Sequence, residues 1–151
     1  MTVVVLNRQR RHRVTLPRLR RLTTAAAARL ALRHATLNIV VLSDAAIARF
    51  NQQFHQTPGP TDILTFDYGD TAELLISADH AAANARHYHT SARHELTLYL
   101  VHGLLHLAGY DDRTPRQRRR MRAAERALLR HLHRSAAKPL FTSLRRSSQR
   151  S

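Results

Sequence analysis

A nearly continuous apolar run at residues 37–42 limits the folds open to this chain more than any other feature. Runs of this kind are typical of strands that are buried on both faces, as in parallel sheets covered by helices. Ser43 and Asp44 follow at once and supply an N-cap, so we expect a helix from there to about Phe54. A strand that passes directly into a helix is the repeating unit of α/β proteins.

The other elements follow from the spacing of apolar residues and from capping residues. Three more strands are predicted at residues 3–6, 62–66 and 73–77. Further helices are predicted at residues 17–33, 79–87 with Asp79 as its cap, 91–108, and from 114 to about 132. The sequence therefore predicts one α/β (α+β) domain over residues 1–134, with a mixed sheet of about four strands and about five helices.

The chain has 151 residues and no cysteine. Disulfides and cysteine-based metal sites are excluded, so any metal must be held by His, Asp or Glu. No apolar run approaches the roughly 20 residues that cross a bilayer, and arginines interrupt the first residues before a signal peptide can form. We therefore expect a soluble, cytoplasmic protein.

Charge is distributed unevenly around a formal net charge of +15. Residues 1–33 hold nine Arg and no acid, and residues 113–151 hold thirteen basic residues and only Glu125. The middle, residues 34–112, has three Arg and nine acids, a net of 3 − 9 = −6. This pattern suits a cation site flanked by surfaces for an anionic substrate. The alternative is an ordinary solvated surface on which Arg replaces Lys. Residues 135–151 are predicted to form a basic, disordered tail.

A candidate metal site stands at the end of the helix at residues 91–108. His102 and His106 are four residues apart, so both imidazoles project from one face. Gly109 ends the helix, which lets the chain fold back and bring Asp111 or Asp112 to that face. Two His and one carboxylate form an open ligand set that leaves a position for water or substrate.

The segment from His102 to Asp112, HGLLHLAGYDD, resembles the HGxLHLxGYDH signature of the YbeY family of single-strand-specific endoribonucleases. Further matches run in order from about residue 37 to 132. Asn51 and residues 61–66 match the family's N…TDVLSF segment. Residues 75–77 and 79 match its next strand and the start of the following helix. Met121 and Glu125 match the M-x-x-x-E spacing of its last helix.

The resemblance implies a zinc-dependent endoribonuclease that matures rRNA, at the 3′ end of 16S rRNA, with single-stranded RNA and the ribosome as partners. It implies that His102, His106 and Asp112 hold the metal and act in catalysis through it. Asp112 stands where most of the family has His; since carboxylate is a harder ligand, zinc is the first expectation, with manganese or iron open.

Two residues are candidates for substrate binding. His55 stands where the family has a basic residue that contacts phosphate, and Asp62 belongs to the matched segment at residues 61–66. Asp62 has the alternative role of a cap or an Arg partner. His80, His87, His89 and His94 are spaced irregularly and are expected to be solvated surface histidines.

Two other functions stay open. One is a non-catalytic assembly factor that binds rRNA through its basic surface. The other is a metallohydrolase acting on peptides or small molecules, but a zinc peptidase carries Glu directly after the first His, and position 103 is Gly.

Overall fold

The computed structural model describes residues 1–55 and 62–149 of the chain, with side chains at residues 1–53 and 62–134. In chain order the elements are β1 (Thr2–Asn7), α1 (Leu16–Arg29), β2 (Thr36–Leu42), α2 (Asp44–Phe50), a π-helical turn (Asn51–His55), β3 (Ile63–Asp67), β4 (Thr71–Ser77), α3 (Ala78–Tyr88), α4 (Ala92–Leu107) and α5 (Pro115–Gln149).

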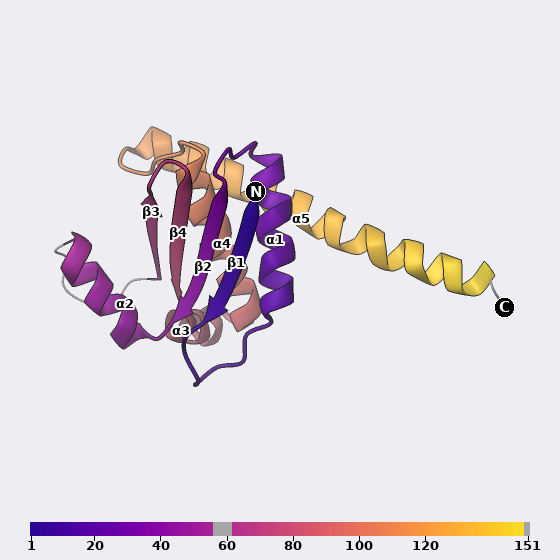
Figure 1. Ribbon diagram of the computed structural model, residues 1–151, viewed down its shortest axis with the longest axis horizontal. Coiled ribbons are helices and arrows are strands. Elements are labelled where there is room, and N and C mark those ends of the chain that lie inside the picture. Colours follow the sequence, from indigo (N-terminus) through magenta and orange to yellow (C-terminus); the bar gives the residue numbers. More distant parts are fainter. Residues whose placement is uncertain (56–61, 150–151) are drawn as a thin grey trace.

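The sheet has the strand order β1-β2-β4-β3 (Figure 1). Strands β1, β2 and β4 are parallel, and β3 is antiparallel to β4 at the edge of the sheet. The predicted mixed four-stranded sheet and five helices are confirmed within the described residues.

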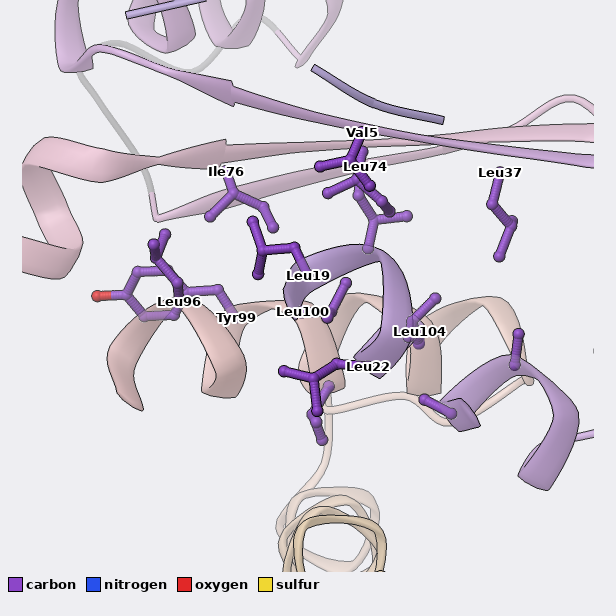
Figure 2. Packing of buried hydrophobic residues seen from close by; sticks show 14 of the residues in the cluster. Val5, Leu19, Leu22, Leu37, Leu74, Ile76, Leu96, Tyr99, Leu100 and Leu104 are labelled. Atoms are coloured by element: carbon purple, nitrogen blue, oxygen red, sulfur yellow. The ribbon is translucent and has the colours of Figure 1, made fainter. Parts of the chain in front are cut away.

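The main core lies between the sheet and helices α1, α4 and α5 (Figure 2). Because side chains alternate along a strand, Ile39, Leu74 and Ile76 point to this face, where Leu100 and Leu104 of α4 meet them. The opposite face has a smaller core in which α2 covers residues of β2, β3 and β4; its buried members are Val40, Leu42, Ile47, Leu64 and Leu75. Residues 37–42 are thus covered on both faces, as the apolar run predicts.

Hydrogen bonds join three elements at the carboxyl end of β4. Ser77 rather than Asp79 caps α3, since its Oγ accepts from the backbone N–H of His80 at 3.0 Å. The prediction of Asp79 as the cap is wrong because the helix begins two residues earlier than a cap at Asp79 would place it. Asp79 accepts instead from the backbone N–H of Asp44 at 2.8 Å and from His12 Nε2 at 2.9 Å. The Asp44 N–H, above all, lowers the pKa of Asp79.

His80 also differs from its prediction as a solvated surface histidine. Its Nδ1 donates to Asp44 Oδ1 at 2.6 Å, and Asp44 also accepts from the Ser77 hydroxyl at 2.6 Å. The pairing escapes prediction because Asp44 and His80 lie 36 residues apart and meet only when β2 and β4 pair.

Helix α5 packs on the domain through its first part, where Met121, Leu128 and Leu132 are buried, and its C-terminal part extends away from the sheet (Figure 1). The helix continues through residues 135–149, the segment that the sequence predicts to be a tail. The division of the chain at residue 134 stays a prediction. No helix among the described residues is both long and apolar enough to cross a membrane.

Candidate metal centre

Helix α4 lies directly against the sheet beside the candidate metal ligands. A Cβ atom on Gly103 would stand 2.5 Å from Ile63 Cδ1 and 2.7 Å from Leu74 Cδ2. These separations are far below van der Waals contact, so a larger residue at position 103 would require Ile63, Leu74 or the helix to shift. The close approach places the neighbouring His102 at the edge of the sheet next to β3.

The turn after α4 brings a carboxylate back to the two histidines. Gly109 has φ of +101°, which favours glycine, and its N–H donates to the carbonyl of His106 at 3.0 Å. The N–H of Tyr110 donates to the carbonyl of Leu105 at 3.0 Å. This pair of bonds is a Schellman motif, which ends the helix and reverses the chain.

The three candidate ligands form a compact group. The Nε2 atoms of His102 and His106 are 3.0 Å apart, and Asp112 Oδ2 lies 3.6 Å from each of them. Their side chains are 31%, 29% and 42% exposed, respectively, so the group can be reached from solvent.

The carboxylate of Asp111 contacts Arg113 and the backbone of Asp112. Its Oδ1 accepts from the backbone N–H of Asp112 at 2.8 Å, and its Oδ2 lies 3.5 Å from Arg113 Nε. Of the two acids that the sequence offers as a third ligand, the structure places Asp112 with the histidines.

Glu125 of α5 contacts His102 at Nδ1, the ring nitrogen that does not face the other two candidate ligands. Its Oε1 lies 2.8 Å from His102 Nδ1, and because a carboxylate only accepts, Nδ1 carries the proton in this bond. The bond to Glu125 raises the pKa of His102, while burial acts in the opposite direction. With Nδ1 fixed as the donor, the neutral imidazole presents its Nε2 lone pair to the site.

Glu125 is a functional candidate that sequence reasoning missed. The M-x-x-x-E spacing placed it in the last helix of the resembling family but gave it no role. That spacing was the available signal, since it sets Met121 and Glu125 on one side of a helix and Met121 is buried.

The group fits a metal ion. Tetrahedral zinc with ligands at about 2.0 Å has ligand–ligand edges of about 3.3 Å, and the observed separations of 3.0 Å and 3.6 Å lie on either side of that length. Among the described residues, these are the three whose ligand atoms all lie within 4.8 Å of one another. His102, His106 and Asp112 can therefore hold a metal ion with one side left open.

The group opens into a cleft of about 530 Å³ between β3, α4 and the turn that follows α4. Asp62 lines this cleft together with both histidines, Asp112 and Arg113. The backbone carbonyl of Asp62 accepts from the N–H of Ser77 at 2.9 Å, which fixes the start of β3. The structure thus brings Asp62 to the metal group.

Two sequence expectations fall in part outside the described residues. His55 ends the π-helical turn after α2, and its side chain is not among those described. Thr61, the first residue of the matched segment at residues 61–66, also lies outside the described residues.

Comparisons with known proteins agree with this geometry. The family model described as Endoribonuclease YbeY matches residues 5–133. Endoribonuclease YbeY of Geobacter metallireducens is 32% identical over 146 residues, which cover 89% of this chain and 97% of that protein. Endoribonuclease YbeY of Geobacter sulfurreducens is 32% identical over 140 residues, which cover 85% and 93%.

A similar fold has been solved for a protein of Thermotoga maritima in solution. The two chains superpose with a TM-score of 0.63 at 24% identity, covering 90% of this chain and 94% of that one. The family match spans the sheet, the metal group and Glu125. This chain therefore belongs to the YbeY endoribonuclease family.

Proposed function

We propose that this protein is a metal-dependent endoribonuclease that cleaves single-stranded RNA during the maturation of ribosomal RNA. The observation that carries the proposal is the open group of His102, His106 and Asp112, which lines a cleft. The names of the relatives supply the reaction class.

A divalent ion held by His102, His106 and Asp112 would supply Lewis-acid stabilisation of a phosphoryl oxygen and would activate a water molecule. The chain's own residues prepare the site for it. His102 and His106 present Nε2 atoms, and Glu125 holds the proton of His102 on Nδ1. Arg113, which lines the cleft, offers a fixed positive charge for the phosphate.

Two side chains are proposed to contact the RNA. Asp62 lies in the same cleft as the metal group, where its carboxylate can accept from a ribose hydroxyl. His55 is proposed as a phosphate contact, because an imidazole N–H can donate to a phosphate oxygen.

The proposed metal is zinc, with manganese or iron as the alternatives that a carboxylate ligand admits. The proposed substrate end is the 3′ end of 16S rRNA, and the proposed partner is the ribosome in the cytoplasm. The +15 net charge of the chain supports a polyanionic partner.

The test is RNA cleavage by extensively purified wild type, His102→Ala and His106→Ala, with metal content measured on the same samples. Both variants should lose the metal and the cleavage activity while their RNA affinity stays near wild type. His87→Ala is the matched control, since His87 is exposed on α3, and it should cleave like wild type.

Cleavage at the wild-type rate by a variant with an emptied site would overturn the proposal. Wild type that binds RNA without cleaving it would also overturn it, in favour of a non-catalytic assembly factor. Activity that RNA competitors do not inhibit would indicate a metallohydrolase for other substrates.

A further inference from the structure

Five arginines form one column along the outer side of α5. They are Arg119, Arg122, Arg126, Arg130 and Arg134, and all five are exposed. Steps of three and four residues keep them on one side of the helix, and each step of four advances about 6 Å along its axis. The column is therefore about 22 Å long, and its charges are spaced much like neighbouring phosphates of a nucleic-acid strand.

The opposite side of α5 is fixed by packing, so the column must face outward. Met121, Leu128 and Leu132 are buried against the domain. Glu125 also points inward, where it accepts from His102 Nδ1.

The inward position of Glu125 leaves the outer side of the helix without a compensating charge. Glu125 is the only acid between residues 113 and 151. Among the described residues, no ion pair involves the arginines of the column. Like charges at i and i+4 destabilise a helix by a few tenths of a kcal/mol per pair. Anions bound along this face would reduce that repulsion.

The column begins beside the cleft. Arg118 Nη1 donates to the carbonyl of Asp112 at 3.3 Å and to that of Arg113 at 3.4 Å, which ties the first turns of α5 to the segment that carries the third metal ligand. Arg113 lines the cleft itself. A strand that leaves the metal group past Arg113 therefore reaches the start of the column.

We propose that this arginine column is a docking surface for the sugar–phosphate backbone of the RNA strand that flanks the cleaved bond. The proposal rests on the proposed function, since it assigns a second surface to the same substrate. Residues 115–134 contain no Phe, Tyr or Trp, so the column offers guanidinium groups without stacking platforms and binds without regard to base sequence.

The test compares two triple variants that each remove three positive charges. Arg119→Gln/Arg126→Gln/Arg130→Gln removes three of the five charges of the column. Arg8→Gln/Arg10→Gln/Arg13→Gln is the matched control, because these residues are exposed in the loop after β1, at the other end of the sheet from the turn between α4 and α5 (Figure 1). Circular dichroism and thermal melting establish that both variants fold like wild type.

Binding is measured with a fluorescent 2′-O-methyl oligouridine of about 20 nucleotides over a range of salt concentrations, with a gel to verify that the probe stays intact. The column variant should bind about tenfold or more weakly than wild type. Its log–log salt slope should be smaller by about 2, from three lost contacts at about 0.7 each on a single strand. The control should keep the wild-type slope.

Cleavage kinetics give a second readout that a folding defect would not imitate. With a 20-nucleotide RNA, the column variant should show a raised KM and an unchanged kcat. With a tetranucleotide, which is too short to extend along the column, both constants should equal those of wild type.

Equal losses in the two triple variants would overturn the proposal, since diffuse charge would then suffice. Wild-type RNA affinity in the column variant would overturn it while leaving the endoribonuclease intact. Failure of the proposed function itself gives a different result, because wild type would then cleave none of the RNA substrates.

Discussion

As the proposed third ligand, Asp112 would set the charge of the metal group as well as its shape. Two neutral imidazoles and one carboxylate leave a bound divalent ion with a net charge of +1, where three imidazoles would leave +2. A lower charge makes the ion a weaker acid toward bound water and favours harder metals than a three-His set does. This single residue therefore affects which ion is held and how it acts.

Substitution of the neighbouring acids tests the ligand assignment. Asp112→Ala should lose the metal and the activity, whereas Asp111→Ala should keep both, because Asp111 faces Arg113 and the backbone of its neighbour. Asp112→His should keep the metal, since it restores a set of three imidazoles. The measurement is the metal stoichiometry of each variant by elemental analysis. Loss of the ion from Asp111→Ala but not from Asp112→Ala would show that Asp111, not Asp112, is the third ligand.

Glu125 is expected to set metal affinity without touching the metal. Glu125→Leu removes the acceptor of the His102 Nδ1 proton and should weaken metal binding by about 10- to 100-fold, the usual effect of removing such a partner. Glu125→Gln keeps an acceptor oxygen and should lose less. Competition with a chelator of known affinity measures the two constants. Identical affinities in Glu125→Leu and wild type would show that the hydrogen bond does not orient the ring.

At the scale of elements, the metal group depends on the contact between α4 and the sheet. His102 stands beside Gly103, whose missing side chain lets α4 lie on Ile63 and Leu74. Leu74 is fully buried in the central part of the core, so it has little room to withdraw. A group added at position 103 must therefore displace Ile63 and Leu74 or move the helix away from β3, the strand that forms the other wall of the cleft.

Gly103→Ala should therefore lower both stability and metal affinity, although alanine favours helix formation. We expect a loss of about 1–3 kcal/mol in the free energy of unfolding, as for overpacked cores. Urea denaturation of wild type, Gly103→Ala, Leu74→Ala and the double variant forms the cycle that isolates the contact. The double variant should cost less than the sum of the single ones, and strict additivity would show that the two positions do not clash.

Sequence patterns predict those features of the elements that depend on neighbouring residues, but not those that depend on residues distant in the sequence. The apolar run at residues 37–42, the helix with His102 and His106, and the stop at Gly109 are read correctly because each depends on neighbouring residues. The pair of His80 with Asp44 and the bond from His102 to Glu125 depend on partners across the fold. No spacing in one segment encodes such partners, so they appear only once the strands are paired and α5 is in place.

For the whole molecule, α5 connects the folded domain to the C-terminal segment. Its described contacts with the core end at Leu132, and beyond residue 134 the helix extends away from the sheet (Figure 1). The segment 135–151 is rich in Ser and Arg, and its apolar residues include Leu140 and Phe141.

Removal of residues 135–151 should leave the domain folded, because the α5 residues described as buried, Met121, Leu128 and Leu132, are all retained. The melting temperature should stay within a few degrees of that of the full chain, and RNA affinity should fall moderately through the loss of four basic residues, Lys138, Arg145, Arg146 and Arg150. Calorimetry of the two chains is the measurement. A large drop in melting temperature would show that Leu140 and Phe141 dock on the domain.

The packing at Gly103 has a consequence for how this fold can diverge. A zinc peptidase needs Glu directly after its first metal-binding His, where the carboxylate serves as general base. In this chain that position faces the sheet, and even a methyl group there would collide with Ile63 and Leu74. A Gly103→Glu substitution would therefore need Ile63 and Leu74 to rearrange, or the helix to shift, before its carboxylate could act at this centre. The same close contact that positions the histidines thus disfavours a general base at position 103, so a base for this centre has to come from another position.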